Sequence, residues 1–358
     1  MAQFAQMPAL GDVVDARYRL EREIGRGSVG VVFEASELES GRRLALKILR
    51  PRIISEQNSV ERFEREARLA SRLTNPHSIQ IHRFGVHHGD GSFGLPYIAM
   101  EYLQGVDLEA YLERRGALSI GETVGILLQA LESLAEAHEQ GIVHRDLKPG
   151  NVFLCNTESG EPAVKVLDYG TAKLVRATSG DPAAQLRLTA DGMICGTPQC
   201  MAPEQALGKR PLTPAVDVYA MGCLGYHMLV GRPLYDGPNK IEVARQHVHE
   251  PIPPMPPAYA RSAVGKALLK ALTKEPGERF AEAPEMAAAL REASARDRIE
   301  VLGHDAAGLD AYEEELFDPY GEEGGFRQGG LGGPRVFLGL AAAAVVVALV
   351  VWLMSVLQ

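Results

Sequence analysis

Cysteine is scarce in this 358-residue chain, and an excess of positive charge is absent. The four cysteines, Cys155, Cys195, Cys200 and Cys223, form no C-x-x-C pair and lack the spacing of zinc ligands. This excludes a disulfide scaffold and predicts reduced thiols in the cytosol. The formal net charge of −9 argues against nucleic-acid binding by neutralisation of phosphates, so we expect no nucleic-acid partner.

Intrinsic disorder of the whole chain is also excluded, because 46% of the residues are hydrophobic and 23% are charged. A chain of this length allows two or three domains. Residues 1–17 contain no apolar run preceded by positive charge, so they are expected to be an N-terminal extension and not a secretory signal.

One long run without charge lies near the C-terminus, at residues 336–357. As an α-helix it would extend about 33 Å, which is enough to cross a bilayer core. The alternative is a buried core helix, but soluble helices of this length usually keep a polar face. We therefore expect a transmembrane helix at 335–357. Arg327 and Arg335 precede it, which predicts a single-pass protein of the cell (inner) membrane whose larger part is cytoplasmic.

Residues 293–334 are acidic and then rich in glycine, as in a flexible juxtamembrane linker. A short helix is expected within this linker at 306–317. The alternative to a solvated spacer is an acidic segment that docks a partner.

The pattern of hydrophobic residues in the body changes along the chain from strand-like to helical, which predicts an α+β protein of two lobes. The expected strands are residues 18–24, 29–35, 43–49 and 97–103. The expected helices are residues 59–73, 108–115, 120–138, 216–230, 241–249, 260–274 and 283–292.

A glycine-rich turn, with Gly25, Gly27 and Gly30, lies between the first two expected strands. Glycine lets the backbone approach an anion closely and donate its N–H groups, so the turn could cover phosphates. By itself the motif is more typical of an ordinary hairpin. Lys47 on the third strand gains interest from Glu66 on the following helix, because a Lys47–Glu66 pair would hold the ammonium against ATP phosphates.

The string HRDLKPGN at residues 144–151 is the strongest signal. Asp146 can orient and deprotonate an attacking hydroxyl, Lys148 can neutralise a moving phosphoryl group, and Asn151 can bind Mg²⁺ or Mn²⁺. Asp168, in the string DYG, can bind the bridging metal ion. These residues predict that ATP is bound and that its γ-phosphate is transferred.

With these motifs and the string Ala202-Pro203-Glu204 in this order, the sequence resembles the eukaryotic-like serine/threonine protein kinases, particularly the bacterial membrane-anchored ones. The string RQHVHEP at 245–251 also looks like bacterial members. The resemblance covers residues 18–292 and implies a β-rich N-terminal lobe at 18–103 and a helical C-terminal lobe at 104–292. It also implies that Asp217 braces the catalytic loop and that Arg279 pairs with Glu204.

The resemblance implies an ATP pocket as well. Met100 would be the gatekeeper, and Glu101 and Leu103 would present hinge backbone to adenine. Phe153 or Leu154 would lie beneath the ring. The residues expected to sandwich adenine are Ile24, Val32 and Ala45. For each apolar residue, plain core packing is the alternative.

The implied substrates are proteins with serine or threonine hydroxyls, because Lys148-Pro149 and Thr197 resemble Ser/Thr-specific members. Arg145 implies control by phosphorylation of the activation loop, residues 168–204, and Thr189 is the expected acceptor ahead of Thr178 and Ser179. Asp191 is expected to supply a constitutive negative charge.

Two residues depart from the family pattern. Tyr169 replaces the usual phenylalanine, so its hydroxyl needs a partner if it is buried. Cys200 replaces a common tyrosine, which could alter substrate docking.

An active kinase has one main competitor, a pseudokinase-like scaffold at the membrane. Such scaffolds usually lose a lysine or a metal ligand, whereas Lys47, Asp146, Asn151 and Asp168 are all present. Gly339 and Ala343 form a small-xxx-small pair in the expected span, which could support a transient homodimer.

Overall fold

A computed structural model describes residues 6–27, 29–54, 59–88, 94–157, 161–169, 198–209 and 211–304, without the side chains of Arg62 and Glu66. All of these residues belong to one unit, Met1–Glu313. The description below is limited to them.

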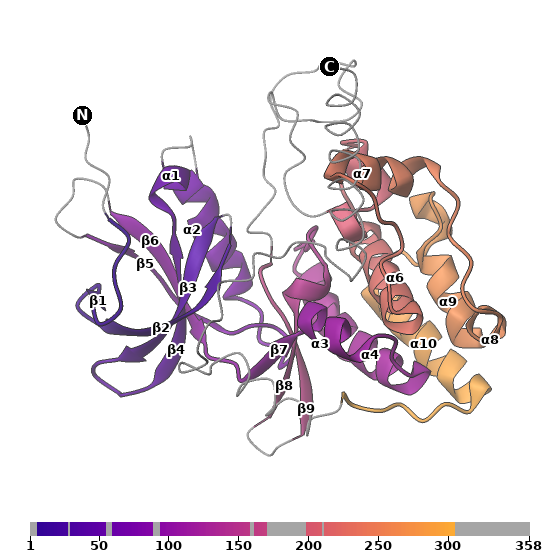
Figure 1. The fold of residues 1–358 in the computed structure, drawn as a ribbon, viewed down its shortest axis with the longest axis horizontal. Helices are drawn as coiled ribbons and strands as arrows, with labels where there is room; N and C mark the ends of the chain where they lie inside the picture. Colours follow the sequence, from indigo (N-terminus) through magenta and orange to yellow (C-terminus); the bar gives the residue numbers. More distant parts are fainter. Residues whose placement is uncertain are drawn as a thin grey trace, which may run out of the picture. The chain divides into compact units, whose positions relative to one another are not determined.

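The N-terminal lobe is built on a six-stranded antiparallel sheet in the order β1-β2-β3-β4-β6-β5 (Figure 1). Buried and exposed residues alternate at the start of β2, as expected of a strand with one face on a core. The lobe also contains two helices between β4 and β5 in the chain, α1 (Pro51–Ile54) and α2 (Ser59–Ala70). Phe63 and Ala67 of α2 pack on Leu49 and Ile98 of the sheet. The strands are β1 (Val13–Val14), β2 (Tyr18–Arg26), β3 (Gly30–Glu37), β4 (Arg43–Leu49), β5 (Ile81–His87) and β6 (Leu95–Glu101).

The C-terminal lobe combines a small three-stranded sheet, in the order β7-β8-β9, with a group of helices. The strands are β7 (Gly105–Asp107), β8 (Val152–Asn156) and β9 (Pro162–Val166). The helices are α3 (Leu108–Arg115), α4 (Ile120–Glu139), α5 (Pro203–Ala206), α6 (Ala215–Val230), α7 (Lys240–His249), α8 (Pro257–Arg261), α9 (Ala263–Ala271) and α10 (Ala283–Asp297). Short 3₁₀ turns are η1 (Pro149–Asn151), η2 (Pro198–Cys200) and η3 (Pro276–Glu278).

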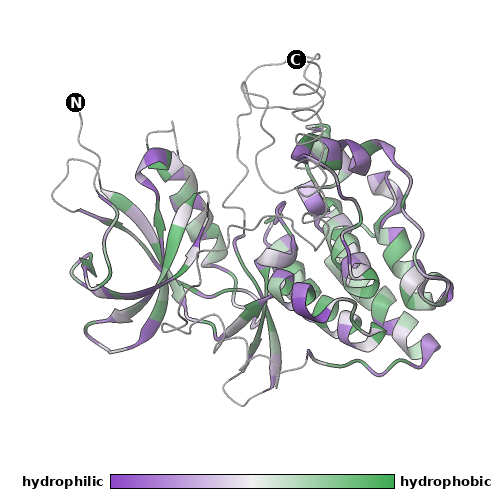
Figure 2. Cartoon of the chain, in the orientation of Figure 1, coloured by the Kyte–Doolittle hydropathy of each residue, from purple (hydrophilic) through white to green (hydrophobic). Residues whose placement is uncertain are grey.

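Helix α6 is buried over nearly its whole length, which marks it as the central helix of this lobe. It ends at Gly231, whose left-handed backbone (φ +74°) suits glycine. Figure 2 shows hydrophobic residues on the strands of the N-terminal lobe and on the helices of the C-terminal lobe. Each lobe accordingly has its own buried core.

The predicted strand 43–49 and the predicted helix 108–115 are confirmed with the same bounds. The helix predicted at 260–274 is wrong as one element, because Ser262 caps a new helix there. The Ser262 hydroxyl accepts a hydrogen bond from the Gly265 N–H at 2.9 Å, which separates α8 from α9.

The chain stays ordered beyond α10. Residues 299–304 run along α4, where the Leu302 N–H donates to the Gly121 carbonyl at 3.2 Å. A side chain at Gly125 would collide with the Leu302 carbonyl, so glycine permits this close approach.

Among the described residues, none of the helices combines the length and the hydrophobicity that a membrane span requires. The span expected at 335–357 and the short helix expected at 306–317 lie outside the described residues.

Candidate active site

The catalytic loop takes its shape from a buried carboxylate on α6. Asp217 is 1% exposed and accepts hydrogen bonds from the backbone N–H groups of His144 and Arg145, both at 2.8 Å. Arg145 has a left-handed backbone (φ +66°), a conformation that costs free energy for a residue with a side chain. The two bonds to Asp217 stabilise that conformation, which confirms the expected bracing role of this residue.

The residues after Arg145 bring a carboxylate, an ammonium and an amide together. Lys148 Nζ lies 3.7 Å from Asp146 Oδ2. Asn151 Nδ2 donates to the Asp146 carbonyl oxygen at 2.7 Å, which leaves Asn151 Oδ1 as an acceptor. The Leu167 N–H donates to the Asn151 carbonyl at 2.9 Å, so the loop is tied to the segment that carries Asp168.

Asp168 meets Lys47, which comes from β4 of the other lobe. Lys47 Nζ donates to Asp168 Oδ1 at 2.6 Å. Burial raises the pKa of Asp168, but the charge and hydrogen bond of Lys47 outweigh it, and the net pKa lies below the usual value. The carboxylate is therefore ionised at neutral pH. Glu66 lies on α2, and its side chain is outside the described residues, so the Lys47–Glu66 pair stays a prediction.

The glycine-rich turn joins β2 to β3, as a hairpin over the site requires. The Gly27 N–H donates to the Gly30 carbonyl at 3.0 Å. A Cβ at Gly30 would lie 2.7 Å from the carbonyl oxygen of Ile48 on β4, so only glycine fits at this close approach of β3 to β4. Gly25 pairs with Val32 across the hairpin.

The residues expected around adenine lie on neighbouring strands, with Ile24 on β2, Val32 on β3 and Ala45 on β4. Glu101 ends β6, and its N–H is engaged by the Gln80 carbonyl at 2.9 Å. Leu103 follows two residues later, and the contact of both backbones with adenine stays a prediction.

Two of the expected pocket residues can be assigned more closely. Leu154 is fully buried whereas Phe153 keeps partial exposure, which favours Phe153 as the residue beneath the ring. Met100, the expected gatekeeper, lines a small cavity together with Lys47, Asp168 and Tyr169.

The oxygens of Asn151 and Asp168 are of the type that Mg²⁺ or Mn²⁺ prefers. Among the described residues no group of three or more histidine, cysteine or acidic side chains forms a metal site. A cation held by these two side chains would need further oxygens, which the phosphates of a nucleotide supply. The residues present therefore fit a metal ion that arrives with ATP.

The buried hydroxyl of Tyr169 has hydrogen-bond partners, and these partners could not be identified from the sequence. The Tyr169 hydroxyl is hydrogen-bonded to Ser133 Oγ of α4, and Ser133 Oγ lies 2.7 Å from Ser78 Oγ. Burial raises the pKa of the Tyr169 hydroxyl, so it stays protonated. The three hydroxyl groups join α4 and the segment before β5 to the residue next to Asp168.

A buried ion pair lies at the C-terminal end of the activation loop. Arg279 forms a two-pronged contact with Glu204, with N–O distances of 2.8 and 2.9 Å, as expected. Gln205 Nε2 donates to the Arg145 carbonyl at 2.7 Å, so α5 contacts the residue before Asp146 directly. No pattern of residues in the sequence indicates this last contact.

Several expected regulatory residues lie outside the described residues, namely Thr178, Ser179, Thr189, Asp191 and Thr197. The cysteines that are described, Cys155, Cys200 and Cys223, are buried free thiols.

Comparison with known proteins supports the same assignment. Serine/threonine-protein kinase pkn3 of Myxococcus xanthus is 38% identical over 79% of this chain and 51% of its own length. Serine/threonine-protein kinase PknA of Mycobacterium tuberculosis is 37% identical over 76% of this chain and 60% of its own length. The chain thus spans only about half to three fifths of these relatives.

Among solved structures, the kinase domain of PknI from M. tuberculosis is 26% identical, with a TM-score of 0.61. The match covers 81% of this chain and all of that domain. The family described as protein kinase domain matches residues 18–290. With this match and the geometry of the catalytic loop, the chain belongs to the protein kinase domain family.

Proposed function

We propose that this chain is an ATP-dependent serine/threonine protein kinase. The observation that carries the proposal is the contact of Lys47 with Asp168 across the two lobes, beside Asp146, Lys148 and Asn151. A pseudokinase-like scaffold would need neither this pairing nor an intact catalytic loop.

The residues divide the chemistry of phosphoryl transfer among them. The Asp146 carboxylate orients the substrate hydroxyl and accepts its proton as the oxygen attacks the γ-phosphorus. Lys148, close to that carboxylate, offsets negative charge on the transferred group. Asn151 and Asp168 would hold Mg²⁺ or Mn²⁺, which neutralises phosphate charge when bound, and Lys47 would orient the phosphates.

The substrate class rests on relatives and on the residues that the resemblance assigns. The two curated relatives above are both named serine/threonine-protein kinases. We further propose autophosphorylation on Thr189, where a phosphate would pair with the Arg145 guanidinium and order the loop. Thr197 would hydrogen-bond Asp146 and Lys148.

Membrane tethering completes the proposal. The uncharged run at 336–357 would anchor the chain, with the kinase domain on the cytoplasmic side. Anchoring raises the effective concentration of one kinase for another, which favours autophosphorylation in trans within a transient homodimer.

The test is transfer of radiolabelled γ-phosphate by the full chain to a generic basic protein, with Mg²⁺ or Mn²⁺. Asp146→Asn removes the proton acceptor and is expected to lower the rate about 100-fold or more. Peptide mapping of the labelled kinase should place phosphate on Thr189.

Asp12→Asn is the matched control, because Asp12 is exposed and its carboxylate accepts a local hydrogen bond from the Ala9 N–H. This variant should keep the wild-type rate. If the wild type binds ATP but transfers no label, the scaffold is the better description. Label on tyrosine alone would contradict the substrate class.

A further inference from the structure

His247 on α7 is buried, titratable and outside the catalytic machinery described above. Its ring is fully buried between two other elements. Nε2 lies 3.0 Å from the Gln199 carbonyl oxygen of η2, and Nδ1 lies 2.9 Å from the Tyr219 hydroxyl of α6. One imidazole thus joins α7, α6 and the C-terminal part of the activation loop.

The partners determine the protonation of the ring. A carbonyl oxygen only accepts, so Nε2 must carry the hydrogen and donate to Gln199. Nδ1 of the neutral ring is then the acceptor for the Tyr219 O–H. Burial, together with the nearby Lys274 ammonium, lowers the pKa of His247 to about 3, so the ring is neutral at physiological pH.

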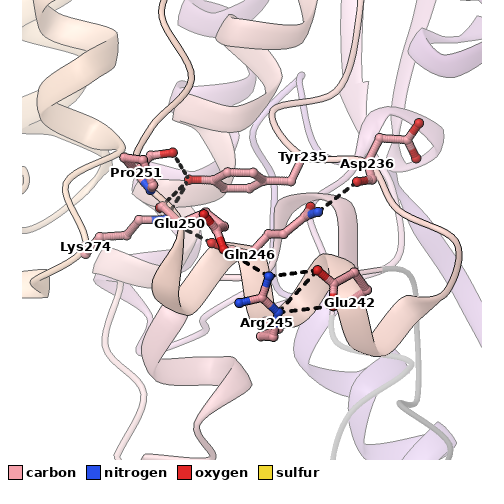
Figure 3. Close-up of polar contacts among 8 residues, drawn as sticks. All are labelled: Tyr235, Asp236, Glu242, Arg245, Gln246, Glu250, Pro251 and Lys274. Carbon is pink, nitrogen blue, oxygen red and sulfur yellow. Dashed lines mark hydrogen bonds and ion pairs between the residues drawn. The ribbon is translucent and has the colours of Figure 1, made fainter.

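Figure 3 shows a polar cluster at the end of α7 that includes Tyr235, Lys274 and Glu250. Lys274 Nζ donates to the His247 carbonyl at 2.7 Å and to the Tyr235 hydroxyl at 2.8 Å. The Tyr235 hydroxyl lies 2.9 Å from the Glu250 carbonyl oxygen and 3.0 Å from that of Pro251. The Tyr235 ring also meets the His247 ring edge-on, with centroids 4.9 Å apart. The backbone and the ring of His247 are therefore both fixed.

The segment that His247 holds leads directly to the catalytic loop. Gln199 is followed by α5, whose Gln205 side chain donates to the Arg145 carbonyl, one residue before Asp146. A polypeptide that presents a hydroxyl to Asp146 would meet this stretch, because α5 contacts the residue next to Asp146. The backbone position at Gln199 then affects the surface that such a polypeptide meets.

We propose that His247 is a positioning residue for the polypeptide substrate. It would act through the Gln199 carbonyl on residues 198–204, the segment on which the substrate would dock. The proposal rests on the proposed kinase function. Loss of the Nε2 hydrogen bond is expected to weaken polypeptide binding, while ATP binds between residues that His247 does not touch.

Two substitutions separate the two hydrogen bonds of the ring. The amide of His247→Gln reaches the position of Nε2 and can still donate to Gln199. The shorter amide of His247→Asn reaches only the position of Nδ1, near Tyr219. We expect His247→Asn to raise the KM for a generic basic protein about tenfold, with the KM for ATP within about twofold of wild type, whereas His247→Gln stays within about threefold for both.

Asn239→Ala is the matched control on the same helix. Asn239 caps the start of α7 by accepting from the Glu242 N–H, and the structure shows no contact of its side chain with Gln199. This variant should lower the melting temperature and leave both KM values unchanged. Hydrogen exchange over residues 198–206 should become faster in His247→Asn and not in Asn239→Ala.

Each outcome decides one question. The proposed role of His247 is wrong if His247→Asn changes neither the KM for the polypeptide nor the hydrogen exchange of residues 198–206. It is also wrong if Asn239→Ala raises the KM for the polypeptide as much as His247→Asn does. If the wild type transfers no phosphate, the kinase function is wrong. In that case hydrogen exchange alone decides whether His247 holds the segment.

Discussion

Compared with the phenylalanine usual in the family, Tyr169 has one more oxygen atom. This hydroxyl lies where α4, the segment before β5 and the residue next to Asp168 meet. Its hydroxyl contacts Ser133 of α4, which is bonded in turn to Ser78. Its ring lies 4.9 Å from that of His144, whose Nε2 lies 2.8 Å from the Leu167 carbonyl. The residue therefore supports the segment that positions Asp168, through packing and through a polar contact.

Tyr169→Phe keeps the ring and removes only the hydroxyl. The two serine hydroxyl groups can still bond each other, so the free energy of unfolding should fall by about 1 kcal/mol. Phosphate transfer should remain close to the wild-type rate, because the Asp168 carboxylate is unchanged. Urea unfolding of the full chain in mild detergent measures the first quantity, and the transfer assay measures the second.

Tyr226→Phe provides the comparison, since the Tyr226 hydroxyl is buried without a hydrogen-bond partner among the described residues. Its removal should leave stability unchanged or raise it slightly. Equal losses in both variants would show that the hydroxyl chain of Tyr169 contributes nothing specific.

At the scale of elements, helix α7 depends on a neutral imidazole where it meets α6 and η2. The pKa of His247 is about 6.5 in the unfolded chain and about 3 in the folded protein. Between these values the unfolded chain binds more protons, so the free energy of unfolding falls as the pH falls through this window. Acid should therefore weaken the attachment of α7 before the carboxylates of the molecule are protonated.

From pH 7 to pH 5, His247 should lower the free energy of unfolding by about 2 kcal/mol. In His247→Gln the side chain at position 247 does not titrate between pH 7 and pH 5. The free energy of unfolding of this variant should therefore fall by about 2 kcal/mol less than that of the wild type over this interval. Urea unfolding of both proteins at both pH values gives the difference, in which other titrating groups cancel. A parallel decrease in the two proteins would mean that His247 is accessible to protons in the folded state.

At the scale of the whole molecule, we propose separate tasks for the protein kinase domain and for the uncharged run at 336–357. The run is expected to place the chain in a membrane. The full chain should sediment with membranes and resist extraction by high salt, whereas a variant without 335–358 should be released. Protease added to sealed vesicles whose cytoplasmic face is outward should digest the kinase domain.

A second deletion separates anchoring from the acidic linker. A variant that lacks 305–334 and keeps the apolar run should still sediment with the membranes. If this variant is released instead, the linker and not the apolar run supplies the attachment. Release of the full chain by salt would contradict insertion altogether.

Much of the site could be predicted from residue types and their order. Asp146, Lys148 and Asn151 are close in sequence, so their proximity in one loop follows from the chain itself. Helix starts were predictable for a similar reason, since Ser119 and Asp107 satisfy backbone N–H groups only three residues ahead. Short-range hydrogen bonds of this kind need no knowledge of the fold.

Contacts between distant residues were decided only by the tertiary structure. Lys47 meets Asp168, Tyr169 finds Ser133, and His247 reaches Gln199 because separate elements pack in one arrangement. A buried polar group must find a partner, but its sequence position does not say which. The order of residues therefore determined the chemistry available to this protein, and packing of the two lobes decided which side chains hold that chemistry in place.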